Sequence, residues 1–154
     1  MGRALINLFG ILFAGVWCIA PAHAFTLTED QPIDFGRFIV AHNTGATSVV
    51  LTTAGEINSN GSILVYKDAQ AGAYTITGAP PLAALTITIT PDPLDLTIAN
   101  NRFFRVDNFT VSSNTTDNSG ELTFTVGATI TSDGDGTYNA ANYKGHYIVT
   151  VTNP

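Results

Sequence analysis

The chain has 154 residues, with six basic and twelve acidic side chains. So few Lys and Arg residues in an acidic chain argue against nucleic acid as a partner, because neutralising phosphates needs clustered positive charge. The length suits one domain and hardly two.

Residues 1–24 have the pattern of a secretory signal peptide. Arg3 supplies the positive charge, residues 4–20 are apolar and uncharged, and Ala22-His23-Ala24 forms a small-x-small cleavage site. We expect cleavage between Ala24 and Phe25 and export to the periplasm, the cell surface or the medium. No later apolar run is long enough to span a membrane, so no membrane insertion is expected after signal removal.

Residues 25–154 are expected to form a single domain that consists of β-strands from end to end. Apolar residues alternate with Thr in the segments 85–90, 122–131 and 147–152, and such alternation gives a strand one apolar and one solvated face. Turns rich in Gly, Asn, Asp and Pro separate the segments. The pattern predicts an all-β, immunoglobulin-like antiparallel β-sandwich of about seven to nine strands. The further predicted strands are 33–41, 48–53, 62–66, 73–77, 94–98 and 103–111.

The phase of the alternation also predicts which side chains face inward. Leu122, Phe124 and Val126 should face the core, and Thr123 and Thr125 should face solvent.

The apolar phase changes at two places within predicted strands, around Gly36-Arg37 and across Asp107-Asn108. A β-bulge inserts one residue and resets the alternation, and Gly36 suits such a position. We therefore predict a bulge or bend at both places.

No catalytic constellation is present in the predicted mature chain. The only cysteine, Cys18, lies in the signal peptide, and no Gly-x-Ser-x-Gly motif occurs, so we expect no enzymatic activity and no cofactor. His42 and His146 are read as surface residues rather than metal ligands, because two histidines need a third ligand beside them.

The segment 133–139 resembles the start of a calcium loop, but it is better explained as a turn rich in Gly and Asp. Thr137 stands at loop position five and Lys144 at position twelve, where calcium loops carry acidic ligands. Weak calcium binding by Asp133 and Asp135 stays open, and no metal site is predicted.

Several segments together resemble a bacterial family, the domain of unknown function 4402. They are Phe35-Gly36-Arg37-Phe38-Ile39-Val40, Thr75-Ile76-Thr77-Gly78, Val106-Asp107-Asn108-Phe109, Gly120 to Ala128, Gly136-Thr137-Tyr138 and Gly145 to Val151. The closing strand is also similar to that of spore-coat-U-type and other archaic chaperone–usher pilins. The resemblance implies a β-sandwich of surface or fimbrial-subunit type, with no settled enzymatic role.

These observations predict a non-enzymatic structural protein of the cell surface, resembling a fimbrial subunit. The predicted mature chain has only Lys67 and Lys144 as lysines, although exposed sheet edges are commonly protected by lysine, so a neighbour could add a strand. The expected partners are further copies of the chain, other surface subunits and an assembly chaperone.

The residues predicted to take part in assembly lie at the two ends of the predicted domain. Phe25 and Leu27 lie in the segment 25–31, the predicted donated strand if the protein polymerises. Tyr147, Val149 and Val151 share one face of the last strand, which must pack into the sandwich or against an assembly partner.

The alternative is a monomeric extracellular ligand-binding or carbohydrate-binding module. Phe103-Phe104 and the five tyrosines could form a platform on which sugars stack. Core packing explains Phe104 equally well, and Trp17, the only tryptophan, lies in the signal peptide.

Overall fold

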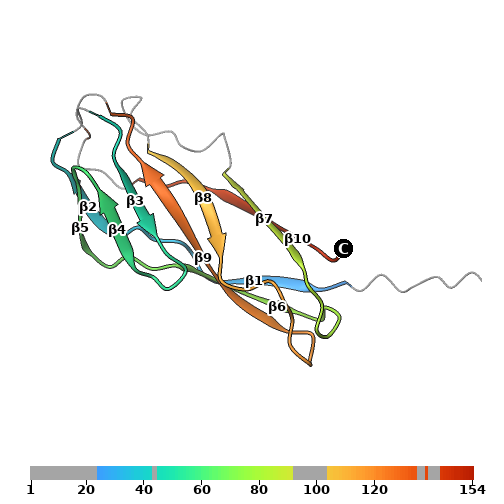
Figure 1. Cartoon of the computed structure of the whole chain (residues 1–154). Coiled ribbons are helices and arrows are strands. Elements are labelled where there is room, and N and C mark those ends of the chain that lie inside the picture. Colours follow the sequence, from blue (N-terminus) through green and yellow to red (C-terminus); the bar gives the residue numbers. More distant parts are fainter. Residues whose placement is uncertain (1–23, 43–44, 92–103, 135–137, 139–142) are drawn as a thin grey trace, which may run out of the picture.

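The computed structural model describes residues 24–42, 45–91, 104–134, 138 and 143–154 (Figure 1). The signal peptide falls almost entirely outside these residues, and its cleavage stays a prediction. No helix that could cross a membrane occurs in the described part of the chain. The described strands are β1 (Thr26–Gln31), β2 (Arg37–Val40), β3 (Ser48–Leu51), β4 (Ile57–Asn60), β5 (Ile63–Lys67), β6 (Gly72–Thr77), β7 (Thr86–Pro91), β8 (Arg105–Val111), β9 (Leu122–Thr131) and β10 (Tyr147–Thr152).

The predicted all-β antiparallel fold is confirmed, but ten strands are described instead of seven to nine. Two of them were not among the strands predicted for the sandwich: β4 was not predicted at all, and the segment of β1 was predicted only as a strand donated to another subunit. Strand β1 has a single apolar residue, Leu27, and β4 reads Ile57-Asn58-Ser59-Asn60, which is typical of a turn. Strand β1 pairs with β6, and β4 pairs with β3. This pairing outweighs the weak strand preference of their own residues. The predicted strand 94–98 lies outside the described residues.

Strand β9 is the central strand of the larger sheet and pairs with other strands on both of its edges. On one edge its first half pairs with β6, through Leu122 to Val126, and its second half pairs with β3, through Ala128 to Thr131. Its second half also pairs with β8 on the opposite edge. Strands β1 and β4 extend the sheet beyond β6 and β3. Two separate ribbons, β7–β10 and β2–β5, complete the fold.

Each ribbon covers its own hydrophobic core, so the molecule in Figure 1 is an elongated sandwich. The first core contains Tyr74 and Ile76 of β6 and Leu122, Phe124 and Val126 of β9, packed against residues of β1, β7 and β10. The second core contains Val49, Ile63, Phe104 and Ile130, packed against residues of β2, β5 and β8. Strand β1 begins and β10 ends at the same end of the molecule (Figure 1).

Both predicted breaks in the alternation are confirmed. Gly36 has φ 70°, and the pairing of β2 with β5 shifts between Arg37 and Phe38. In β8, Asn108 has φ 51°, and the pairing with β9 shifts between Asp107 and Thr110. An extra residue in one strand turns the following side chains onto the other face, which explains the changed phase in the sequence.

The predicted register of β9 is confirmed as well. Leu122, Phe124 and Val126 are buried and Thr123 is exposed. Thr125 is only half-buried, and its hydroxyl donates a hydrogen bond to the carbonyl oxygen of Thr53 at 2.8 Å. Thr123 is therefore the better residue at which to test the solvent face of β9.

Replacing Phe124 with Ala should destabilise the fold strongly. Phe124 is 1% exposed and stacks on Tyr74 with ring centroids 5.3 Å apart. We expect a loss of about 3–5 kcal/mol in the free energy of unfolding, as for other buried aromatic residues. Thr123→Ala should cost less than about 1 kcal/mol. Denaturant unfolding of both variants measures the difference, and equal costs would contradict the register.

Replacing Gly127 with Ala should also destabilise the fold, because β3 departs from β9 beside it. A Cβ atom at Gly127 would lie 2.4 Å from the carbonyl oxygen of Leu51 and 2.8 Å from the carbonyl carbon of Thr52. We expect Gly127→Ala to cost about 1–3 kcal/mol through overpacking. Gly45→Ala, where a Cβ would meet nothing within 4 Å, is the control and should be close to neutral in the same unfolding assay.

Candidate functional site

The strand order matches an immunoglobulin-like sandwich in which one position is open. Immunoglobulin constant domains place strands A, B, E and D in one sheet and C, F and G in the other. Strands β1, β6, β9 and β8 are neighbours in the order A-B-E-D, and β7 and β10 correspond to C and F. Among the described residues, no strand pairs with β10 at the position of G.

A cleft of about 410 Å³ lies where that strand would be, between β1 and β10. Leu27 and Ile33 line the cleft from β1 and the segment that follows it, and Tyr147 and Val149 line it from β10. Tyr74 of β6 contributes a further wall. The cleft thus lies between the edges of the two sheets. Most of the residues that line it are apolar or aromatic.

A polar cluster links the two sheets at this cleft. The Tyr74 hydroxyl donates to Oε1 of Glu29 at 3.2 Å and is hydrogen-bonded to the Tyr147 hydroxyl. The Tyr147 hydroxyl also lies 3.5 Å from the same Glu29 oxygen. These contacts connect β1, β6 and β10, which are far apart in the sequence.

Both tyrosines of the cluster are protonated at neutral pH. Burial raises the pKa of Tyr74 above its ordinary value, and the hydrogen bond with Tyr147 raises it further. Burial also raises the pKa of Tyr147. The contact between the sheets is therefore made by neutral phenols, which can act as both donors and acceptors.

The backbone of β10 has its free groups on the side of the cleft. Leu85, just before β7, donates its N–H to the carbonyl oxygen of Asn114 at 2.8 Å, away from β10. Backbone groups alternate between the two edges of a strand, so Thr86 and Thr88 point toward β10 and pair with Thr152 and Thr150. By the same alternation, the N–H and C=O groups of Tyr147, Val149 and Val151 point toward the cleft.

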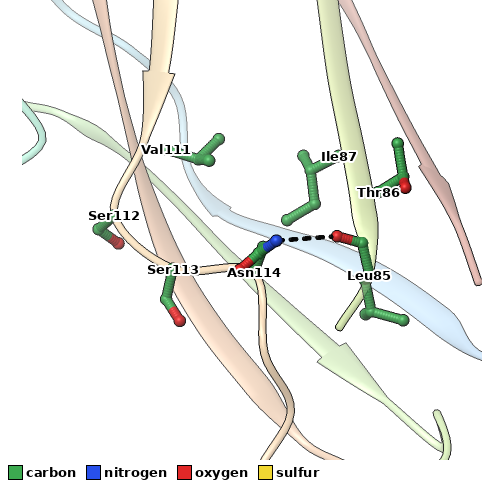
Figure 2. Close-up of a pocket in the computed structure, with 7 residues that line it drawn as sticks. All are labelled: Leu85, Thr86, Ile87, Val111, Ser112, Ser113 and Asn114. Carbon is green, nitrogen blue, oxygen red and sulfur yellow. Dashed lines mark hydrogen bonds between the residues drawn. The ribbon is translucent and has the colours of Figure 1, made fainter. Parts of the chain in front are cut away.

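A second cleft of about 360 Å³ lies on the other side of the ribbon, between β7 and the segment that follows β8. Figure 2 shows Ile87 and Val111 on opposite sides of it, with Asn114 at the end where the two segments meet. There the side-chain amide of Asn114 donates to the carbonyl oxygen of Leu85 at 3.2 Å. None of the described residues that line this cleft carries a charged side chain.

The structure brings the five predicted assembly residues into one core. Phe25 and Leu27 of the N-terminal segment and Tyr147, Val149 and Val151 of β10 all pack against the first core. The segment predicted as a donated strand is in this structure β1, paired with β6 of its own chain. It forms one wall of the cleft rather than a free arm.

The sequence reasoning missed Glu29, Ile33 and Tyr74. Tyr74 lies in the predicted strand 73–77, but nothing local links it to Tyr147, 73 positions away.

Of the other positions considered, the structure describes His42, His146 and Asp133. His42 and His146 are exposed, and His146 borders the first cleft. No group of three metal-ligating side chains is found among the described residues. The Tyr138 hydroxyl donates to Oδ1 of Asp133 at 3.0 Å, whereas Asp135 lies outside the described part.

Phe104, one of the aromatic residues considered for a sugar platform, packs into the second core. Phe104 is 3% exposed and is stacked on Tyr138, with ring centroids 4.2 Å apart, and Tyr143 meets it edge-on. This confirms the core interpretation of Phe104. Phe103 is outside the described residues.

Comparison with known proteins identifies the family. The model of the family described as "Domain of unknown function (DUF4402)" matches residues 25–152. The chain belongs to this family. No curated protein and no solved structure matches it.

The tyrosine cluster predicts an alkaline loss of stability. Below the ordinary tyrosine pKa of about 10, Tyr74 and Tyr147 are protonated in the folded and unfolded chain, so they add no pH dependence. Above it the unfolded tyrosines ionise before the folded ones, and the free energy of unfolding falls.

Tyr74→Phe should reduce the slope of this loss, since it removes one raised pKa. Denaturant unfolding at a series of pH values from about 8 to about 11 tests this for both proteins, because the range spans the ordinary tyrosine pKa. Equal slopes would contradict the assignment.

Proposed function

We propose that the protein is a non-enzymatic, exported structural subunit of the cell surface, similar to fimbrial pilins, that assembles by β-strand addition. The observation that carries the proposal is the open strand position between β1 and β10. β-Strand addition supplies main-chain hydrogen bonds, while pockets for alternate side chains supply specificity, as in chaperone–pilin complexes.

The cleft offers both elements of that recognition. Tyr147, Val149 and Val151 turn toward it backbone groups that pair with no described strand, and an extended strand could pair with them along the whole of β10. Leu27 and Ile33 on its other side offer apolar surface to the inward side chains of such a strand. Filling the cleft would complete the second sheet and bury side chains that now only partly cover the first core.

The sequence adds two supporting observations. The family match begins at Phe25, the residue predicted to start the exported chain, which suits a leader that is removed. The closing strand, Gly145 to Val151, resembles that of archaic chaperone–usher pilins and forms β10, the edge of the cleft. In this proposal a chaperone covers the cleft before assembly, and a strand from another subunit covers it afterwards.

The position of β1 changes the expected source of the donated strand. Because residues 26–31 already pair with β6, deleting the N-terminal segment would remove a wall of the cleft and core contacts of Phe25 and Leu27. We therefore propose that the cleft accepts an extended strand from a further copy, another surface subunit or an assembly chaperone, while β1 stays in place.

A proline in β10 should block assembly without breaking the ribbon. Val149→Pro removes an N–H that points to the cleft, whereas the ladder to β7 uses the N–H groups of neighbouring residues. We expect the full-length protein, isolated from its native host, to form higher-order species by size exclusion and electron microscopy. The Val149→Pro variant should lose them.

Ile89→Pro is the matched control, because its N–H points away from β10 on the other edge of the same ribbon. The Ile89→Pro variant should still form the higher-order species. Circular dichroism should show that both proline variants are folded. Assembly of Val149→Pro at the level of the unmodified protein would refute strand addition at this cleft. A full-length protein that stays monomeric at all stages of growth would favour the binding-module alternative.

A further inference from the structure

Glu29 gives the cleft between β1 and β10 a negative charge that no described residue balances. Its two described contacts, with the hydroxyls of Tyr74 and Tyr147, are both made by Oε1. Within the described part of the chain, nothing pairs with Oε2 and Glu29 forms no ion pair. Of the described residues that line the cleft, Glu29 is the only acidic one and none is Lys or Arg, while His146 lies at its border.

A strand added to β10 would bring one of its side chains to this carboxylate. Neighbouring strands are antiparallel in the sheets of an immunoglobulin-like sandwich, so a strand added beside β10 runs antiparallel to it. Residues directly opposite each other in such a pair have their side chains on the same face, about 5 Å apart. The residue opposite Tyr147 therefore faces inward beside Tyr147, whose hydroxyl lies 3.5 Å from Oε1 of Glu29.

The next two inward positions of the added strand have an apolar setting. They lie opposite Val149 and Val151, which pack against the first core together with Phe25 and Leu27. The added strand thus needs two apolar side chains and, opposite Tyr147, one that complements a carboxylate. Lys and Arg suit the last position, because their aliphatic stems cover apolar surface while their charged ends donate strong hydrogen bonds to carboxylate oxygens.

We infer that the cleft selects a strand that carries Lys or Arg opposite Tyr147 and apolar residues opposite Val149 and Val151. The basic side chain pairs with Oε2 of Glu29 and leaves the contacts of Oε1 with the two tyrosines in place. This inference rests on the proposed function, since it concerns a strand that adds to β10.

The same selection disfavours the N-terminal segment of another copy as the added strand. With its Phe25 opposite Val151 and its Leu27 opposite Val149, the incoming Glu29 lies opposite Tyr147 and beside the Glu29 already present. Like charges in such a position destabilise a strand pair. The added strand then comes from a different protein that has a basic residue at this position.

Three peptides that differ at one position test the selection. Each reads Thr-Val-Thr-Val-Thr-X-Thr, which places X opposite Tyr147 and the two valines opposite Val149 and Val151. X is Lys, Glu or norleucine, which keeps the carbon chain of Lys without its charge. In fluorescence anisotropy with the monomeric fraction of the full-length protein, the Lys peptide should bind about three-fold to ten-fold more tightly than the norleucine peptide, and the Glu peptide most weakly.

Two matched variants separate a contact in the cleft from the overall charge. Glu29→Gln keeps a side-chain oxygen for the tyrosine hydroxyls and should remove the preference for Lys over norleucine. Asp30→Asn is the control, because it removes one charge from the next residue of β1, whose Oδ2 accepts a hydrogen bond from Thr75 outside the cleft. This control should keep the preference.

The outcomes distinguish the selection from strand addition itself. Equal binding of the three peptides, lost in Val149→Pro, would overturn the selection and support strand addition. A preference for Lys that survives Glu29→Gln, or that Asp30→Asn removes as well, would also overturn the selection. If no peptide binds, or if folded Val149→Pro binds them as tightly as the unmodified protein, strand addition at this cleft is refuted and the inference falls with it.

Discussion

The pairing of β9 on both of its edges is the constraint on which the rest of the structure depends. This ten-residue strand meets β6 and then β3 on one side and β8 on the other. Its inward side chains supply Leu122, Phe124 and Val126 to the first core and Ile130 to the second. Gly127 lies between the part of β9 that pairs with β6 and the part that pairs with β3. There the carbonyl oxygen of Leu51 in β3 comes too close for a side chain. Strand β8 also spans both cores, since its Phe109 packs against the first and its Val106 against the second, so these two paired strands hold the cores together.

The ribbon β7–β10 is attached in a different way. Its side chains pack on the first core, and the backbone contacts of Leu85 with Asn114 secure one end. Along the rest of its length, neither edge pairs with another described strand. Such edges are open to other chains unless charge, proline or a covering element protects them. Within β7 and β10 themselves, Pro91 is the only proline and no residue is charged.

The contact of Tyr74, Tyr147 and Glu29 determines how the ribbon lies over the sheet. It joins the two layers by polar groups beside the cleft. Both phenols are protonated across the neutral pH range, as any tyrosine with the ordinary pKa of about 10 would be, and burial raises their pKa further.

The sequence by itself determined the class of fold and most of its strands. Alternation of Thr with apolar residues identified β7, β9 and β10, and the changes of phase located the irregular positions at Gly36 and Asn108. These features are local, since a strand's two faces follow from the period of its own residues. The polar strands β1 and β4 were not recognised as strands of the sandwich, because they form only through pairing with β6 and β3. The tertiary structure alone decided which edges remain open and that Tyr74 meets Tyr147. Strand order and contacts between layers join segments far apart in the chain, and no local pattern in the sequence specifies them.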